Sequence, residues 1–270
     1  NKFSFQGIDI SSYINQEMVW SSSRIARLIL ISGAFRRVIE AIPIKELVYI
    51  MFEFSFGRMI SFVLSRYNNR IMRTGFNHGD YSWRYLNYFL AKNEGSVTPP
   101  YINHCPIPDR LLVEDQLCAD IYKFNGYQNI ELMSEVFRLK YLKGIEPTLQ
   151  EDLALIAAGL HDGEPLIKCL ASQIRANSNT TYLFKPHPRA DNRYIKNMPV
   201  IENLRVVESS IEHLLSLVGR IYVTYSGVGV EGRRLGIPVT LVDMPGKVAW
   251  SKLLDSENLA VRDSQYIEST

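Results

Sequence analysis

Residues 223–243 of this 270-residue chain read VTYSGVGVEGRRLGIPVTLVD, and this stretch indicates the class of fold. An apolar run ends at Thr224, a turn of small residues follows, and residues 228–235 have helical spacing. Gly236–Ile237–Pro238 then stops the helix before a second apolar run. Strand, turn, helix, stop and strand in this order predict a βαβ unit of a parallel sheet.

The turn at the start of that helix suits a phosphate. Ser226, Gly227 and Gly229 let a ligand approach the backbone, and a helix N-terminus attracts anions through unpaired N–H groups and its dipole. Glu231 lies one turn into the helix, where its carboxylate could bind a ribose diol. The alternative is an ordinary α/β crossover with a glycine-containing turn, because short glycine motifs also match by chance.

A second stretch, 180–189, reads TTYLFKPHPR and also predicts an anion site. An apolar strand ends abruptly in a loop that two prolines stiffen. Lys185, His187 and Arg189 alternate along this loop, so all three could face one anion. Ligands of open α/β sheets bind at the carboxyl ends of the strands, which is where this loop lies. The alternative is a solvated basic loop.

Composition favours one large or two medium α/β domains with real cores, since 46% of the residues are hydrophobic and 21% are charged. The net charge of +2 and the lack of a basic stripe argue against a nucleic-acid partner. No apolar run reaches the length of about 18 residues that spans a membrane. Three cysteines, Cys105, Cys118 and Cys169, show no CxxC pairing and indicate free thiols in a reducing cytoplasm.

The rest of the chain alternates strands with helices, which predicts parallel sheets in both halves. We expect an N-terminal domain over 1–146 and a C-terminal domain over 147–270, joined by a linker around Pro147, with a cleft between them. Because the chain starts without Met and in mid-pattern, we expect that the N-terminal domain is incomplete. The expected strands are 46–52, 70–75, 110–114, 129–133, 153–158, 182–185, 204–207, 220–224 and 239–243. The expected helices are 13–42, 56–66, 82–91, 116–124, 135–143, 165–176, 228–235 and 248–255, with one more to 218 that the capping-box spacing at 209–212 opens.

Other nucleotide and metal motifs are missing from the sequence. It has no Walker GxxxxGK[ST] motif, and the GxGxxG spacing of Gly227, Gly229 and Gly232 lacks the acidic residue about 20 residues further on that is usual in a dinucleotide site. No cluster of His, Cys and carboxylate residues has metal spacing, so we expect no bound metal and no tightly held cofactor. A nucleotide with few phosphates remains the best candidate for the ligand.

The second half resembles the donor-binding domain of a GT-B glycosyltransferase, on the segment from Ser226 through Glu231 to Gly236–Ile237–Pro238–Val239. KPHPR at 185–189 resembles the His-Pro motif of bacterial enzymes that use CMP-activated sugars, both sialyltransferases and Kdo transferases. In the first half, several short motifs resemble a bacterial surface-carbohydrate family related to the retaining β-Kdo transferases. These motifs are YIMFEFSFGR at 49–58, GFNHG at 75–79, PIPD at 106–109, Gly126–Tyr127 and EVFRLKYL at 135–142. The resemblance covers nearly the whole chain and implies a GT-B fold with two Rossmann-like domains.

The resemblance implies a role for each matching residue of the second half. Lys185, His187 and Arg189 would hold the phosphate of CMP or the carboxylate of the sugar. Ser226 and the amides of Gly227 and Gly229 would hold the phosphate, and Glu231 the ribose. The implied donor is CMP-Kdo, and the implied acceptor is a surface glycan or glycolipid.

Catalysis would need a carboxylate near the anomeric carbon, since the transition state resembles an oxocarbenium ion. Glu53, Asp80 and Asp109 lie at or near expected strand ends. We expect Glu53 to be the nucleophile of a covalent adduct, with Asp80 second and His78 nearby. A helix-capping role for Glu53 and a turn role for His78 are the structural alternatives.

Two further functions stay open on the sequence alone: a sialyl- or polysialyltransferase, and a nucleotide-sugar-binding subunit without activity. We expect a cytoplasmic protein. Contact with the inner face of the bacterial inner membrane is an open alternative, because residues 24–37 could form a basic amphipathic face. The oligomeric state and the acceptor linkage are not indicated.

Overall fold

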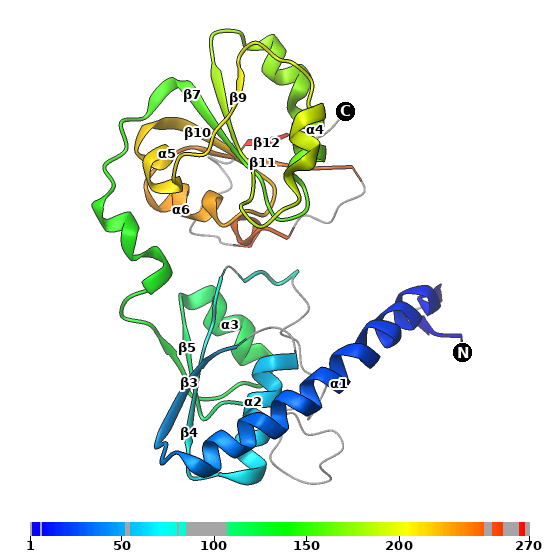
Figure 1. Ribbon diagram of the computed structural model, residues 1–270. Coiled ribbons are helices and arrows are strands. Elements are labelled where there is room, and N and C mark those ends of the chain that lie inside the picture. Colours follow the sequence, from blue (N-terminus) through cyan, green and yellow to red (C-terminus); the bar gives the residue numbers. More distant parts are fainter. Residues whose placement is uncertain are drawn as a thin grey trace. The chain divides into compact units, whose positions relative to one another are not determined.

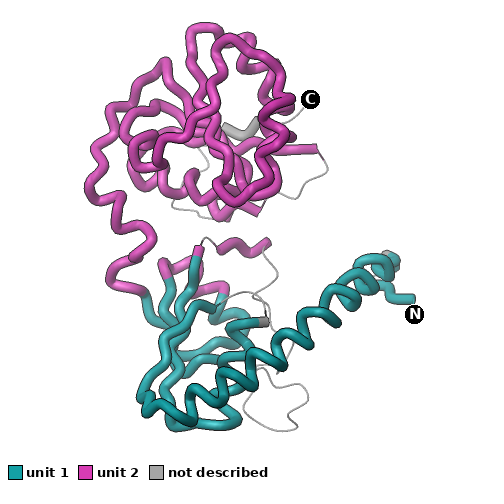
Figure 2. Tube along the Cα trace, in the orientation of Figure 1, with its two compact units in different colours: residues 1–78, 87–113, 122–132 teal, residues 79–86, 114–121, 133–270 magenta. Residues whose placement is uncertain are grey.

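The computed structural model describes residues 2–5, 7–51, 55–79, 81–84, 107–245, 250–255 and 265–267. The chain forms two compact units (Figure 2). Unit 1 comprises 1–78, 87–113 and 122–132, and unit 2 comprises 79–86, 114–121 and 133–270. The long continuous run of unit 2 therefore begins at Met133, earlier than the boundary at 146/147 that the linker pattern suggested.

Unit 1 is built on a four-stranded parallel sheet in the order β3-β4-β5-β6. Its strands are β3 (Glu46–Ile50), β4 (Met72–Phe76), β5 (Arg110–Val113) and β6 (Ile130–Leu132). The helices are α1 (Ser11–Ala41), α2 (Ser55–Tyr67) and α3 (Gln116–Phe124), of which α3 begins in the part of the chain assigned to unit 2. A short antiparallel pair, β1 (Ser4–Phe5) and β2 (Ile8–Asp9), precedes α1.

One face of this sheet is covered by α2 and by the last turns of α1 (Figure 1). Ile39 of α1 is buried with Val63 and Leu64 of α2, and Ile71 completes the cluster. Pro43 follows the end of α1, as expected for a residue that cannot continue a helix. The earlier turns of α1 take no part in this cluster.

Unit 2 is built on a six-stranded parallel sheet in the order β12-β11-β10-β7-β8-β9 (Figure 1). Its strands are β7 (Gln150–Ala157), β8 (Thr181–Lys185), β9 (Leu204–Val206), β10 (Val218–Val223), β11 (Val239–Val242) and β12 (Gln265–Ile267). Its α-helices are α4 (Gly163–Ala176), α5 (Ile211–Leu217) and α6 (Val228–Arg234). Three 3₁₀ helices complete it: η3 (Phe137–Gly144), η4 (Asn192–Asn197) and η5 (Lys252–Leu254).

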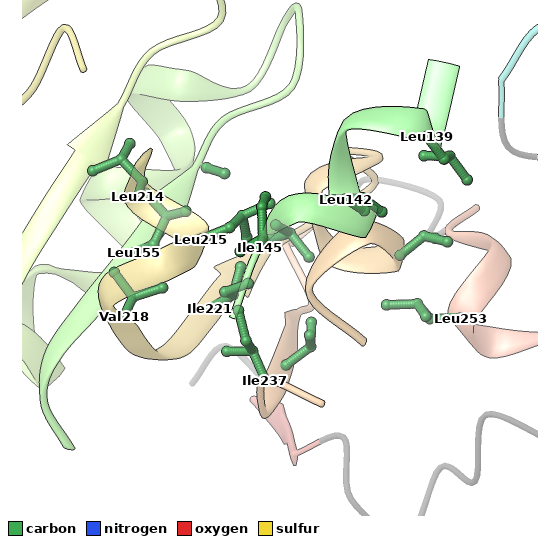
Figure 3. Packing of buried hydrophobic residues seen from close by; sticks show 14 of the residues in the cluster. Leu139, Leu142, Ile145, Leu155, Leu214, Leu215, Val218, Ile221, Ile237 and Leu253 are labelled. Atoms are coloured by element: carbon green, nitrogen blue, oxygen red, sulfur yellow. The ribbon is translucent and has the colours of Figure 1, made fainter. Parts of the chain in front are cut away.

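Both faces of the six-stranded sheet are buried, as expected for a parallel sheet. Alternate residues of β7 divide between two cores: Leu155 packs with α5, α6 and η3, while Ile156 packs with α4. Figure 3 shows the first core, in which Leu139 and Leu142 of η3 lie near Leu253 of η5. The segment that follows β6 in the chain is thereby part of the core of unit 2.

Two short segments from the first half of the chain are held in unit 2 by residues in and after η5. Asp255 accepts hydrogen bonds from the Trp83 amide (2.9 Å) and the Arg84 guanidinium (2.7 Å). Lys252, only 3% exposed, donates to Asp115. These segments directly follow β4 and β5, so unit 2 includes the residues that come after two strand ends of unit 1.

The predicted parallel sheets and nearly all predicted helices and strands are confirmed, with the following differences. Residues 137–144 form a 3₁₀ helix instead of an α-helix. Ser210 rather than Ser209 caps α5, since its hydroxyl accepts from the His213 amide (3.2 Å). The predicted helix at 248–255 is reduced to η5 among its described residues, and β12 was not predicted. Residues 85–91 of the predicted helix 82–91 lie outside the described residues, and 83–84 form a turn.

Candidate functional site

The strands of unit 2 follow the Rossmann order: in chain order they are third, second, first, fourth, fifth and sixth across the sheet. The order reverses between β7 and β10, and ligands of such sheets bind outside the carboxyl ends of the strands at this switch point. Three loops leave the sheet there, at 158–162 after β7, 186–191 after β8 and 224–227 after β10. Because β7 lies between β8 and β10, the loop after β7 is flanked by the two predicted anion-binding loops.

The loop after β8 places its three basic residues differently. Lys185 donates from Nζ to the carbonyl of Glu208 (2.9 Å), on the side of β9. His187 is half-buried, and its Nδ1 accepts from the Arg189 amide (3.2 Å). Arg189 itself is exposed. The three side chains therefore do not share one direction, and Lys185 is already engaged by the protein.

His187 is suited to donate to an anion in its neutral form. Burial lowers the pKa of His187, and the neighbouring Arg189 cation lowers it further. Because Nδ1 is an acceptor, the single proton of the neutral ring resides on Nε2. That N–H is the group with which His187 could bind a phosphate oxygen.

The turn after β10 contains two glycines with different surroundings. Gly227 is the N-cap of α6, and its position stays consistent with the predicted phosphate turn. Gly229 donates its amide to the Ser226 carbonyl (3.0 Å), and an added Cβ there would lie 2.7 Å from Val223. Gly229 is therefore required for close packing of α6 on β10, and its role as a phosphate ligand stays a prediction.

Glu231 faces η3 in this structure. Its carboxylate lies 3.8 Å from the Arg138 guanidinium and close enough to Tyr141 to influence the pKa of that hydroxyl. Burial raises the pKa of Tyr141, and the neighbouring Glu231 carboxylate raises it further. Arg138 also forms two bonds to Glu114, at 2.6 and 2.7 Å. The role of Glu231 at a ribose stays a prediction, and binding there would compete with these partners.

Sequence reasoning missed the loop between the two anion-binding loops. Asp162 is 2% exposed, its Oδ2 accepts from the Thr224 hydroxyl, and its Oδ1 has no hydrogen-bond partner among the described residues. Burial raises the pKa of Asp162 despite the Thr224 bond. A buried carboxylate of raised pKa at a switch point is typical of a functional site. The sequence did contain a signal for this loop, because GLHDG at 159–163 places two glycines, a histidine and an aspartate directly after an apolar strand.

The same loop also fixes the turn after β10 through Tyr225. The Tyr225 hydroxyl accepts from the His161 amide (3.1 Å), and its ring stacks on Trp250 at a centroid distance of 4.4 Å. Gly159 makes room for that ring, because a Cβ there would lie 2.5 Å from the ring. The contacts of the Tyr225 ring with Gly159 and Trp250 thus fix the position of the next residue, Ser226.

Replacing Asp162 by asparagine is expected to raise the melting temperature at pH 7.5. A folded-state pKa above the ordinary value of 3.8 means that the carboxyl group stabilises the fold below that value. This contribution is lost as the pH rises through the folded pKa, because ionising the carboxyl group in the fold costs more than ionising it in the unfolded chain. Asparagine keeps an acceptor for Thr224 without the charge. The gain should shrink as the pH is lowered to 4 in melting scans.

Asp191 provides the control for this pH series. Its pKa is lowered to about 2 by the adjacent Arg193, so Asp191→Asn should bring no gain at pH 7.5. An Asp162→Asn protein that melts below the wild type at pH 7.5, or a gain that grows on acidification, would contradict a buried ionised Asp162.

The predicted catalytic residues belong to the strand ends of unit 1 and to the segments that follow them. Glu53 and Asp80 lie outside the described residues, so their roles stay predictions. His78 is exposed beyond the end of β4. Asp109 lies before β5, at its amino end, and accepts from the Arg73 amide (2.8 Å) and Nε (3.0 Å). Asp109 therefore connects β4 to the amino end of β5. This corrects the expectation that Asp109 lies with Glu53 and Asp80 at the ends of the strands that face a ligand.

Metal ligands do not gather in the described parts of the chain: no three His, Cys, Asp or Glu side chains there form a group that could hold an ion. Within the same residues, no helix has both the length and the apolar character to cross a membrane.

Comparison with solved structures identifies the fold. The calicheamicin glycosyltransferase CalG4 matches with 12% identity and a TM-score of 0.57, over 94% of this chain and 68% of that one. The UDP-GlcNAc 2-epimerase of Methanocaldococcus jannaschii, in complex with UDP-GlcNAc and UDP, matches with 11% identity and a TM-score of 0.53, over 88% and 69%. The UDP-N-acetylglucosamine 2-epimerase of Rickettsia bellii matches with 12% identity and a TM-score of 0.51, over 86% and 63%.

The chain spans 63–69% of the length of these three proteins. Neither a protein-family model nor a curated protein matches the sequence. At this level of identity the likeness concerns the fold alone. The chain has the α/β fold with parallel sheets that GT-B glycosyltransferases and UDP-GlcNAc 2-epimerases share.

Proposed function

We propose that this protein is a glycosyltransferase that transfers Kdo from CMP-Kdo to a surface glycan or glycolipid. One observation carries the proposal: the KPHPR loop and the Ser226–Gly227 turn follow the two strands on either side of β7, at the switch point of a Rossmann sheet. A fold shared with nucleotide-sugar enzymes supports sugar transfer in general, and the KPHPR loop is the feature that favours a CMP-sugar.

The donor would be held by groups that the structure leaves accessible. His187 would donate from Nε2 to the single phosphate of CMP, and the turn at Ser226 and Gly227 would bind the same phosphate from the other side of the β7 loop. Arg189, exposed at the end of the basic loop, would pair with the carboxylate on the anomeric carbon of Kdo. His187 would serve the phosphate of CMP. The carboxylate of a 2-keto sugar acid then explains why the loop carries a further cation, Arg189.

Chemistry at the anomeric carbon would use Glu53 as the nucleophile, with Asp80 as the second candidate and His78 beside them. The carboxylate would displace CMP and form a glycosyl–enzyme adduct, which the acceptor hydroxyl would then attack with overall retention. No metal or tightly held cofactor is part of this proposal. The enzyme would work in the cytoplasm, at the inner face of the membrane where a lipid-linked acceptor is found.

Three other activities must be separated from this one. CMP-sialic acid satisfies the same chemistry at His187 and Arg189, so a sialyltransferase is the alternative within CMP-sugar enzymes. A nucleotide-sugar-binding subunit would bind CMP without transfer. The fold shared with UDP-GlcNAc 2-epimerases adds a fourth activity, which predicts that UDP binds better than CMP.

CMP is expected to raise the melting temperature, and UDP and GDP much less. Each of the proposed contacts serves a single phosphate, so the second phosphate of UDP gains nothing and must be desolvated. At 100 times its dissociation constant, CMP should add about 2.7 kcal/mol to the free energy of unfolding. Melting scans with each nucleotide measure this, followed by transfer assays with CMP-Kdo and CMP-sialic acid.

Two histidine variants make the test specific for the site. His187→Gln should lose most of the CMP-induced shift, while His213→Gln, at an exposed position on α5, should keep it. A larger shift with UDP than with CMP, together with interconversion of UDP-GlcNAc, would replace the proposal by an epimerase. A CMP shift without transfer of either sugar would indicate a binding subunit.

A further inference from the structure

The first turns of α1 expose apolar side chains that no described residue of unit 1 covers. Met18, Val19, Ile25, Ile29 and Leu30 are between 55% and 76% exposed. Figure 1 shows this part of α1 extending beyond the four-stranded sheet, whereas its last turns pack on α2. Soluble proteins rarely leave so much contiguous apolar surface in water, so this stretch indicates a contact surface.

At 3.6 residues per turn, Met18, Ile25 and Ile29 share one side of α1, and Val19 and Leu30 lie on the flank beside it. Arg24 and Arg27 lie on the opposite side, where the Arg24 guanidinium lies 5.7 Å from the centre of the Trp20 ring. An apolar side opposite a side that carries arginine is typical of helices that lie in a membrane interface.

Charge decides what covers this surface. The stretch 18–30 carries Arg24 and Arg27 and no aspartate or glutamate; Glu17 lies just before it, and Arg36, further along α1, is ion-paired with Glu40 (2.7 Å). A second copy packed on the same stretch would bring the same two positive charges there. An anionic lipid surface brings the opposite charge and an apolar layer for the aliphatic side.

We propose that α1 docks the protein on anionic phospholipid through its residues 18–30. Ile25 and Ile29 enter the acyl boundary, and Arg24 and Arg27 pair with lipid phosphates around the helix. This inference concerns unit 1 alone and does not depend on the identity of the donor. It supplies the contact through which an enzyme of the proposed function would reach a lipid-linked acceptor.

Vesicle flotation of the whole chain tests the proposal. We expect binding to vesicles of phosphatidylcholine with 30% phosphatidylglycerol, and at least tenfold weaker binding to phosphatidylcholine alone. Binding should fall in 0.5 M NaCl, because salt screens the arginines. Arg24→Gln/Arg27→Gln should bind about 30-fold more weakly, as expected for two contacts with an anionic surface.

Ile25→Asp/Ile29→Asp should also lose binding by at least tenfold, since charged side chains cannot enter the acyl boundary. Both sites are exposed, so circular dichroism should show unchanged helix content. The matched controls lie in unit 2: Val200→Asp, at a position 97% exposed, and Arg175→Gln/Arg205→Gln should bind like the wild type.

Two results would overturn the proposal. The first is equal binding of all variants, or equal binding to neutral and anionic vesicles. The second is no vesicle binding at all, combined with a dimer in light scattering that Ile25→Asp/Ile29→Asp abolishes, which would assign α1 to a second copy instead. Because no nucleotide is present, neither result bears on CMP binding, and failure of the proposed function leaves this test unaffected.

Discussion

Replacing Arg138 by methionine is expected to lower the free energy of unfolding by about 3–5 kcal/mol, the usual cost of breaking a buried ion pair. Arg138 forms two short bonds to Glu114, whose side chain is 1% exposed, and lies 3.8 Å from Glu231. Methionine fills a similar volume but leaves both carboxylates without their cation. Urea unfolding at pH 7.5 measures the loss.

Arg193→Met is the matched control for this prediction. Arg193 also makes two-pronged contact with a carboxylate, that of Asp191, but the two side chains are 89% and 59% exposed. Water can solvate Asp191 in place of Arg193, so the free energy of unfolding of this variant should equal that of the wild type. Adding Glu114→Gln to Arg138→Met should recover part of the loss, because the stranded charge is then gone. Equal behaviour of Arg138→Met and Arg193→Met would contradict a buried network.

The sequence sufficed for most of the fold because the signals were local. Pro43 and Gly236 mark the ends of helices. Apolar runs that are buried on both faces, such as Leu153–Ala158, are typical of strands in a parallel sheet. The errors occurred where tertiary contacts decide. Residues 137–144 have a helical pattern, yet Leu139 and Leu142 pack into the core of unit 2, and this segment forms a 3₁₀ helix.

The roles predicted for the candidate site stay predictions, and the structure adds which of its groups already have a partner. Spacing can show that Lys185, Gly229 and Glu231 lie near a strand end, but not which partner each has already taken. Lys185 bonds to Glu208, Gly229 bonds to Ser226, and Glu231 forms an ion pair with Arg138. Asp162 was missed because its neighbours in sequence do not show that it is buried. Its partner Thr224 follows β10, which lies more than fifty residues further along the chain.

Gly159→Ala is expected to disrupt the turn that would bind the donor phosphate. The new methyl group would lie 2.5 and 2.6 Å from two carbons of the Tyr225 ring, which is closer than real Cβ contacts allow. The ring cannot move aside without giving up its stack on Trp250 and its bond from the His161 amide. Overpacking of this kind costs about 1–3 kcal/mol, and the displacement reaches Ser226, the next residue.

Two measurements on Gly159→Ala separate the site from general stability. Urea unfolding gives the loss of stability, and melting scans with CMP should show a shift smaller than that loss explains. Gly33→Ala is the control. No atom lies within 4 Å of its added Cβ, so inside α1 this variant should be about 0.5–1 kcal/mol more stable and keep the CMP shift.

Adding Tyr225→Ala to Gly159→Ala restores the space, so stability should partly return while the CMP shift does not. If Gly159→Ala instead unfolds like the wild type and keeps the full shift, the Tyr225 ring does not rest on Gly159, and the turn at Ser226 is positioned by Asp162 and Thr224 alone.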